Sequence, residues 1–383
     1  MQTREKYEAL EGQFLAPYAS TSGRSEGRIH PEEEHPLRSR FQRDRDRIIH
    51  SKAFRRLEYK TQVFVNHEGD HYRTRLTHSI EASQISRSVA RMLRLNEDLA
   101  EAIALSHDLG HPPFGHSGEA VINSLMEGHG GFEHNRQSFR IVTFLEHSYA
   151  EFHGLNLSYE VLEGICKHTK SYELPDGNLF ERKGCFSLEA QVVNLADEIA
   201  YNNHDLDDGL RSQMITLQQL RDVEIWQELY EEAEHRLKDF PEAFKAQATV
   251  KALINFLVTH LVEEAEKKIK SQKIHTYEDV KERGDGVISF SPEVRKKTSE
   301  LKKFLFANLY RHYRVERMAD KGNRILRDLF HTYEHNPRIL PPEVYKKTEE
   351  EDPHRVICDY VAGMTDRFAL EEHDKLFNPH SKV

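Results

Sequence analysis

Cysteine is scarce in this chain: its 383 residues include three, Cys166, Cys185 and Cys358. Their wide spacing provides neither a CxxC zinc motif nor a disulfide framework, which fits a reducing compartment. Long hydrophobic runs are missing as well, since stretches such as ALINFLV (252–258) are far shorter than the roughly 20 residues of a membrane-spanning helix. The start, MQTREKYEAL, carries too much charge for a signal peptide. We therefore expect a cytoplasmic protein that does not insert into a membrane.

Positive charge is not in excess either. Lys and Arg number 54 against 64 Asp and Glu, and the net charge of -10 gives no general reason to expect nucleic-acid binding. Two arginine-rich stretches, RDRDR (43–47) and FRRLEYK (54–60), leave contact with nucleic acid or a phosphate-bearing activator open. The alternating aspartates favour a salt-bridged helix face instead. With 31% charged and 38% hydrophobic residues, the chain is typical of a folded globular protein.

Apolar spacing is helical through most of the chain, and few windows alternate as a strand would. Residues 1–40 lack clear periodicity and are expected to form an extended N-terminal arm, whereas 170–184 and 281–293 are expected to be loops. The chain is predicted to be all-α, with a core over 41–250 and a helical C-terminal portion over 251–383 packed on that core. Helices are predicted near 76–94, 97–109, 132–146, 158–168, 187–205, 222–237, 243–270, 293–312, 314–334 and 354–374.

Titratable groups gather in SHDLGHPPFGHSGE (106–119), a stretch that also has to turn sharply. His107 and Asp108 stand at the end of a predicted helix, where they fit a simple cap as well as a metal site. His116 and Glu119 are three residues apart, so they can meet if the chain resumes a helix after PPFG. Glu119 would then orient His116 as a general acid or base near neutral pH.

Asp197 interrupts the apolar face of SLEAQVVNLADEIAYNNHDLDDG (187–209) and forms one stripe with Tyr201 and Asp205, four and eight residues on. A carboxylate on such a face needs a partner if it is buried. Taken alone, His78, one turn after Arg75, is better interpreted as an ordinary packed or surface histidine. A shared cation changes that interpretation, because it would provide the partner and suit a mixed set of nitrogen and oxygen donors. That set is His78, His107, Asp108 and Asp197.

The order of these residues, a histidine, then a His-Asp pair, then a distant aspartate, resembles the HD superfamily of metal-dependent phosphohydrolases. Five blocks resemble more closely the dGTPase-type deoxynucleoside triphosphate triphosphohydrolases, and DKGNRILRDLFHTYEHNPRILP (320–341) extends the resemblance from about residue 40 to near the C-terminus. It implies an all-α HD-domain fold with a helical C-terminal portion. The blocks are FQRDRDRIIHSKAFRRLEYKTQVF (41–64), RTRLTHSIE (73–81), HDLGHPPFGHSGE (107–119), GFEHNRQSFRI (131–141) and LADEIAYNNHDLDDG (195–209).

The resemblance implies roles for individual residues. The quartet His78, His107, Asp108 and Asp197 would bind a divalent metal, one of Mg, Mn, Fe, Co or Ni. His116 and Glu119 would be catalytic. The substrate would be bound at the triphosphate by Arg75, His111 and His134, and at the sugar by Gln62, Tyr201 and Asp205.

The implied activity is hydrolysis of dGTP or several dNTPs to deoxynucleoside and inorganic triphosphate. The resemblance also implies a homo-oligomer, with a second, activating nucleotide bound at subunit contacts. An HD-type nucleotidase or phosphodiesterase is one alternative, which the triphosphate-binding Arg75 disfavours. A non-catalytic nucleotide-sensing or single-strand-binding protein is another, which the intact His116 and Glu119 disfavour.

Overall fold

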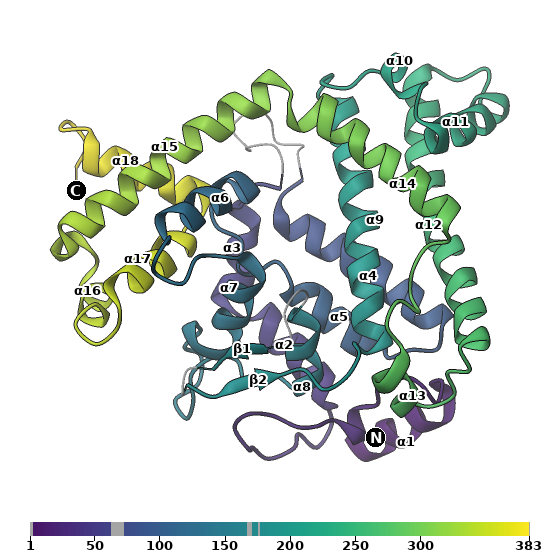
Figure 1. Ribbon diagram of the computed structural model, residues 1–383, viewed down its shortest axis with the longest axis horizontal. Coiled ribbons are helices and arrows are strands. Elements are labelled where there is room, and N and C mark those ends of the chain that lie inside the picture. The colour runs from purple at the N-terminus through teal and green to yellow at the C-terminus, as the bar shows by residue number, and fades with distance from the viewer. Residues whose placement is uncertain (1–2, 63–72, 167–170, 175–176, 383) are drawn as a thin grey trace. The chain divides into compact units, whose positions relative to one another are not determined.

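The computed structural model describes residues 3–62, 73–166, 171–174 and 177–382 (Figure 1). Over these residues almost all of the regular secondary structure is helical, so the predicted all-α fold is confirmed. The one sheet within the described ranges is an antiparallel hairpin of β1 (Ser171–Glu173) and β2 (Leu179–Glu181). This hairpin corrects the prediction that 170–184 is entirely loop. Its three-residue strands are too short for alternation to be recognised, although Tyr172 and Phe180 are paired and buried.

The chain forms two compact units, each built from three separate segments. The first unit comprises Met1–Ile49, His78–Leu105 and Asn156–His312. The second comprises His50–Thr77, Ser106–Leu155 and Tyr313–Val383.

The first unit is built around α9 (Leu188–Arg211), against which α8 (Tyr159–Ile165), α12 (Glu242–Ser271) and α14 (Pro292–Leu305) pack (Figure 1). The Ser187 side chain begins α9 by accepting a hydrogen bond from the backbone N–H of Ala190. The other helices of this unit are α1 (Arg4–Phe14), α2 (Arg40–Ile49), most of α4 (Arg75–Met92) and of α5 (Glu97–Ser106), α10 (Leu217–Leu220), α11 (Glu224–Arg236), α13 (Tyr277–Arg283) and a π-helical turn at Phe306–Tyr310.

The second unit is organised by α15 (Tyr313–His335), which packs against α6 (Gly115–Leu125), α17 (Pro353–Ala362) and α18 (Asp366–Phe377) (Figure 1). Its core is aliphatic and aromatic, with Ile122, Leu326 and Phe330 almost fully buried. The remaining helical elements are α3 (Lys52–Arg56), α7 (His134–Arg140), a π-helical turn at Ile141–Leu145, and α16 (Pro342–Lys347).

Two further expectations need correction. The predicted helix 354–374 is two helices, α17 and α18, because α17 ends at Ala362 and Thr365 caps the start of α18. The supposedly extended arm contains α1. Its periodicity is hidden because the residue that α1 buries is Glu11, whose carboxylate accepts hydrogen bonds from Ser22, while Leu10 and Phe14 are exposed.

The RDRDR stretch lies in α2, and its charged side chains form ion pairs within the first unit, as the alternating aspartates predict. Asp44 pairs with Arg28, Arg45 with Asp98 at 3.0 Å, and Arg47 with Glu32 at 2.7 Å. The arginines of this stretch therefore have carboxylate partners within the unit, as expected for a salt-bridged helix face.

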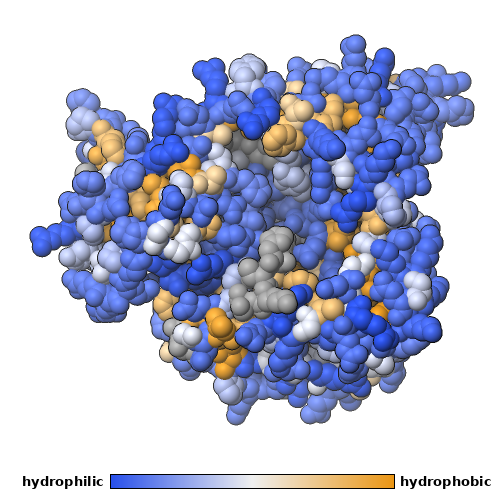
Figure 2. Space-filling model, viewed as in Figure 1, coloured by the Kyte–Doolittle hydropathy of each residue, from blue (hydrophilic) through white to orange (hydrophobic). Residues whose placement is uncertain are grey.

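The surface is mostly hydrophilic on the face drawn in Figure 2, where hydrophobic residues form separate small patches. Among the described helices, none is both long and apolar enough to cross a membrane.

Gly110 is a point of close approach that tests the packing of the second unit. A Cβ added there would lie 2.2 Å from the carbonyl oxygen of His134 and from the amide nitrogen of Ser138, both backbone atoms of α7. We expect Gly110→Ala to lower the free energy of unfolding by about 1–3 kcal/mol or more, because backbone cannot yield to overpacking. Gly12→Ala is the control: that exposed helical site has nothing within 4 Å and should gain roughly 0.5–1 kcal/mol. Denaturant melts measure both, and a neutral Gly110→Ala would contradict the packing.

Candidate active site

A sharp bend positions the histidines of the second unit. Phe114 and Gly115 both have left-handed backbone, with φ of 61° and 60°; Phe114 is the N-cap of α6, and Gly115 is its first residue. The strain at Phe114 is held by packing, since its ring fills the space beside Gly322, where an added Cβ would lie 2.6 Å from it. The helix resumes as the sequence predicts, and it brings the His116 ring to 5.3 Å from that of His111.

Asp108 is buried among cationic and imidazole groups. Its Oδ2 accepts from Arg75 at 2.9 Å, while its Oδ1 lies 3.2 Å from His107 Nε2 and from His111 Nδ1. Burial acts to raise the pKa of this carboxyl, but His107, His111 and Arg75 together outweigh it and hold the pKa well below the usual range. Asp108 is therefore a carboxylate at neutral pH, able to act as a metal ligand.

His111 is kept neutral in the same environment. Burial first, and then the charge of Arg75, lower the pKa of its imidazole well below the ordinary value. The ring stacks on His134 with centroids 4.0 Å apart, and no described residue hydrogen-bonds to its buried Nε2. A neutral imidazole with an open nitrogen is suited to bind a ligand atom.

Glu119 joins two histidines. It accepts from His116 Nδ1 at 3.1 Å, from His134 Nδ1 at 2.8 Å and from the His134 backbone amide at 2.9 Å. Burial raises the pKa of Glu119, but the hydrogen bonds from His116 and His134 lower it more. Because 63% of the His116 side chain is exposed, its other ring nitrogen is accessible to a substrate. With His111, these groups have donor atoms within 4.8 Å of one another and could also hold a metal.

A second set of predicted residues lies in the first unit. His78 Nε2 is 3.0 Å from Asp197 Oδ1, which joins α4 to the stripe on α9. His78 Nδ1 lies 3.4 Å from Nδ1 of His204, and His204 in turn pairs with Glu81. The stripe therefore does carry paired polar groups, as the interruption of the apolar face suggests.

Asp205, at the far end of the stripe, contacts a residue that the sequence did not identify. The hydroxyl of Tyr310, in the π-helical turn after α14, donates to the carboxylate of Asp205. Burial and the charge of Asp205 raise the pKa of Tyr310, so the phenol keeps its proton. Its ring lies 6.1 Å from that of Tyr201, which places two phenols and a carboxylate together.

His204 and Glu81 were also missed, although the sequence carried a signal for each. His204 follows Asp197 by seven residues, two helical turns, and Glu81 follows His78 by three, so each shares a face with a predicted ligand. Tyr310 carried no such signal, because its contact depends on the π-helical turn.

Gln62 ends the described part of its segment. It is buried, and its Oε1 has no hydrogen-bond partner among the described residues. Asp366 anchors the preceding residue by accepting from the amide and hydroxyl of Thr61, and it also accepts from the amide of Phe114 at 3.0 Å. Gln62 is thus held close to the bend, with an acceptor available.

The units divide the predicted site residues into two groups, which are described separately. The second unit brings together Arg75, His107, Asp108, His111, His116, Glu119 and His134, and also contains Gln62. The first unit pairs His78 with Asp197 and places Tyr201 and Asp205 beside Tyr310. Their catalytic and binding roles remain predictions.

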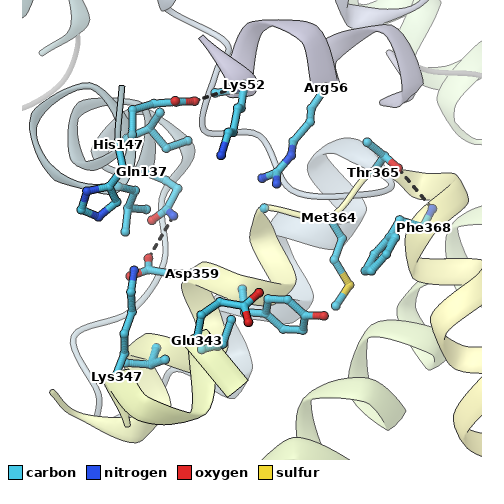
Figure 3. A pocket seen from close by; sticks show the side chains of 18 of the residues that line it. Lys52, Arg56, Gln137, His147, Glu343, Lys347, Asp359, Met364, Thr365 and Phe368 are labelled. Carbon is cyan, nitrogen blue, oxygen red and sulfur yellow. Dashed lines mark hydrogen bonds between the residues drawn. The ribbon is translucent and has the colours of Figure 1, made fainter. Parts of the chain in front are cut away.

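The second unit also contains a separate cavity of about 490 Å³ (Figure 3). Lys52 and Arg56 of α3 line it on one side and Lys347 of α16 on another, around an apolar wall that includes Met364 and Phe368. No salt bridge joins these three cations to any described carboxylate. Two of the carboxylates that line the cavity already accept hydrogen bonds: Asp359 from Gln137 and Arg140, and Glu146 from the amide of Ala53.

Comparison with known proteins identifies the class. Residues 75–202 match the HD domain, and residues 288–375 match a phosphohydrolase-associated domain. The chain is therefore an HD-domain phosphohydrolase, a hydrolase class that depends on a metal.

Relatives over the whole length define the family more narrowly. The chain is 52% identical over 385 residues to a deoxyguanosinetriphosphate triphosphohydrolase-like protein of Geobacter sulfurreducens, with 100% of both chains covered. It is 54% identical to the protein of that name from Geobacter metallireducens, over 96% of each chain. For the Thiobacillus denitrificans protein of that name the identity is 51%, over 95% of this chain and 97% of the relative. The chain belongs to this family, which confirms the resemblance.

The Glu119 carboxylate should stabilise the fold in a pH-dependent way. We expect Glu119→Gln to lower the free energy of unfolding at pH 7 by roughly 1.5–3 kcal/mol, the usual contribution of charge-assisted hydrogen bonds. Because folding lowers the pKa of Glu119 below the ordinary 4.5, this contribution is fully present above pH 4.5 and is lost gradually as the pH falls from 4.5 towards the folded-state pKa. In urea melts from pH 7 to pH 3, the difference between the two proteins should stay constant down to about pH 4.5 and narrow below it. A difference that stays constant down to pH 3 would contradict a role for the charge.

Proposed function

We propose that this protein hydrolyses deoxynucleoside triphosphates to a deoxynucleoside and inorganic triphosphate. The observation that carries the proposal is the hydrogen-bonded His116–Glu119–His134 cluster beside the neutral His111, on the motif that the family resemblance assigns to catalysis. The name shared by the relatives, deoxyguanosinetriphosphate triphosphohydrolase-like protein, supports the same substrate class.

The donor set fits a divalent cation. We infer that His78, His107, Asp108 and Asp197 hold it, because two imidazoles and two carboxylates suit Mn, Fe, Co, Ni or Mg. Asp108 is a carboxylate and His78 contacts Asp197, so donors of the required kind are present. When bound, the cation would activate water and offset phosphate charge.

The residues of the chain would then handle the substrate and the proton. The guanidinium of Arg75, which donates to Asp108 in this structure, would bind the triphosphate. Nε2 of His111, which has no hydrogen-bond partner among the described residues, lies in the same cluster. Water attacks the α-phosphorus and loses a proton to solvent while the bond from that phosphorus to the 5′-oxygen breaks. His116, oriented by Glu119, donates a proton to the departing 5′-oxygen. The electron pair of the broken bond stays on that oxygen, so the triphosphate leaves as one unit.

The sugar contacts would exclude ribonucleotides. We propose that Gln62 and the Tyr201–Tyr310–Asp205 group contact the deoxyribose, and that their close packing leaves little room for a 2′-hydroxyl. The enzyme should therefore prefer dGTP to GTP.

Product analysis tests the function directly. Each dNTP and NTP is incubated with the protein and Mn or Mg in oxygen-18 water, and the products are separated by chromatography. We expect deoxynucleoside and triphosphate, with the label in the triphosphate only. His116→Asn should keep its metal and lose roughly 10²- to 10⁴-fold in rate, whereas Asp197→Ala should lose both metal and turnover. A dNMP product would indicate a pyrophosphohydrolase, and binding without turnover would favour a nucleotide sensor.

The cavity beside α3 and α16 suits a regulatory ligand. We propose that the expected activating nucleotide binds there, because Lys52, Arg56 and Lys347 lie around an apolar wall. Two of the four lining carboxylates, Asp359 and Glu351, are paired with Arg140, which leaves Glu146 and Glu343 to offset these cations. Gln137, in α7, lines the same cavity, and α7 begins at His134, so a ligand there could influence the catalytic cluster.

Mixtures of dNTPs test this second proposal. Arg56→Ala and Lys347→Ala should abolish the stimulation of one dNTP's hydrolysis by another, since each removes a charge that would meet the phosphates. Lys346→Ala, an exposed neighbour in α16 outside the cavity lining, is the matched control and should keep it. Stimulation that survives both cavity variants would exclude this site.

A further inference from the structure

Two ionisable side chains are buried beside the Phe114–Gly115 bend, and the proposed mechanism uses neither of them. Lys60 is 2% exposed and Asp366 is 5% exposed. Both belong to the second unit, where Lys60 lies between α3 and α4 and Asp366 is the first residue of α18. Because burial of a polar or charged group is unfavourable unless the group is hydrogen-bonded, the contacts of these side chains indicate why they are there.

Asp366 uses its two carboxylate oxygens on segments that are far apart in the sequence. Its Oδ2 accepts from the amide of Thr61 at 3.0 Å and also from the Thr61 hydroxyl. Its Oδ1 accepts from the amide of Phe114 at 3.0 Å. Thr61 precedes Gln62, the proposed sugar contact, and Phe114 is two residues before His116, the proposed proton donor. One carboxylate therefore holds the segments of both groups.

Lys60 makes a second connection between the same segments. Its Nζ donates to the carbonyl of His111, which precedes the bend, and to the carbonyl of Ala362 at 3.1 Å. Its own carbonyl accepts from the amide of Arg75 at 3.2 Å, where α4 begins. Lys60 therefore connects the loop that carries His111 to the start of the helix that carries Arg75.

The two segments also pack closely on each other. A Cβ added at Gly115 would lie 3.5 Å from the carbonyl oxygen of Gln62 and 3.7 Å from that of Thr61. It would lie 3.3 Å from Nη2 of Arg75. The backbone of the bend thus contacts the segment that ends at Gln62, so a loosened anchor would change the distance between the proposed proton donor and the proposed sugar contact.

The C-terminal part of the chain supplies these anchoring groups. Ala362 ends α17 and Asp366 begins α18, and both lie in the phosphohydrolase-associated domain at 288–375. Met364 and Thr365, between them, line the cavity of about 490 Å³ (Figure 3). The linker from α17 to α18 therefore provides a wall of the cavity and an anchor of the bend, which gives the associated domain a direct part in the geometry of the catalytic region.

We propose that Asp366 and Lys60 are positioning residues, which fix the distance between the bend that carries His116 and the segment that ends at Gln62. This inference rests on the proposed function, because the roles of His116 and Gln62 belong to that function. Asp366 and Lys60 act through the groups that contact the substrate and do not touch it themselves. Their loss should therefore lower kcat and the preference for dGTP over GTP together.

Two substitutions at Thr61 separate positioning from packing. Thr61→Val keeps the shape of the side chain but removes the hydroxyl that donates to Asp366, whereas Thr61→Ser keeps the hydroxyl and removes a methyl group. We expect Thr61→Val to lose about 10-fold in kcat for dGTP, with a lower ratio of kcat/KM for dGTP to that for GTP, and Thr61→Ser to stay near wild type. A packing role predicts the opposite order, because only serine leaves a cavity.

Asp366→Asn and Lys60→Met test the anchors themselves. An amide at position 366 has one oxygen, so its NH₂ group must face an N–H of Thr61 or of Phe114. We expect each variant to lose about 10²-fold in kcat, the effect of a misplacement near 1 Å, with bound metal unchanged. Hydrogen exchange followed by mass spectrometry should increase over residues 110–119 and stay unchanged in α9. This exchange is measured without nucleotide, so it reports on the anchors even if the protein hydrolyses no dNTP.

Glu160→Gln is the matched control for a buried carboxylate. Glu160 is 3% exposed and accepts from the hydroxyl of Ser25 at 2.7 Å and from the amide of Glu26 at 2.8 Å, both in the first unit. Its substitution should lower the free energy of unfolding but leave kcat and the dGTP preference of the folded protein unchanged.

Thr61→Val keeps the amide contact to Asp366, so it carries the test if Asp366→Asn does not fold. Wild-type kcat and dGTP preference in Thr61→Val and in the folded anchor variants would overturn the positioning role, and so would unchanged exchange over residues 110–119. A wild-type protein that hydrolyses no dNTP, together with increased exchange in the anchor variants, would contradict the proposed function and leave the anchors in place.

Discussion

A carboxylate that must stay charged inside the second unit is the constraint on which the active-site region depends. Asp108 is buried, so its ionised form has to be stabilised by Arg75 and by the rings of His107 and His111. Those partners in turn need positions within hydrogen-bond reach, which the Phe114–Gly115 bend and its Asp366 anchor provide. The ionised Asp108 can for the same reason act as a metal ligand, because a cation would stabilise the negative charge that Arg75 and the two histidines stabilise in this structure.

Helix α7 contacts parts of the second unit that have different chemical roles. Its first residue, His134, contacts Glu119, and its Gln137 lines the cavity beside α3 and α16. The hydroxyl of its Ser138 accepts a hydrogen bond from the amide of Gly110 and donates one to the carbonyl of His107. A seven-residue helix bound on so many sides can move only if several contacts move with it, which suits it to relay the state of one site to another.

The sequence was sufficient for the fold class and for the residues with short-range relations. The pairing of His116 with Glu119 and the common face of Asp197, Tyr201 and Asp205 follow from helical spacing. Contacts that depend on irregular backbone were not predictable: Tyr310 reaches Asp205 through a π-helical turn, and α1 buries a carboxylate instead of an apolar stripe. Three-residue strands were missed because two or three alternations do not rise above chance. No local pattern could have placed Asp366 beside Thr61 and Phe114.

The interleaved segments of the second unit have a consequence for synthesis of the protein. Helix α6 ends at Leu125, but α15, which covers its apolar face, begins at Tyr313. At translation rates of about 5–20 residues per second, Ile122 and its neighbours wait roughly ten seconds or longer for their partners to leave the ribosome. During that interval the nascent chain presents an incomplete hydrophobic core, a substrate for holding chaperones. Truncation near the C-terminus should therefore affect solubility more strongly than the loss of a peripheral tail would.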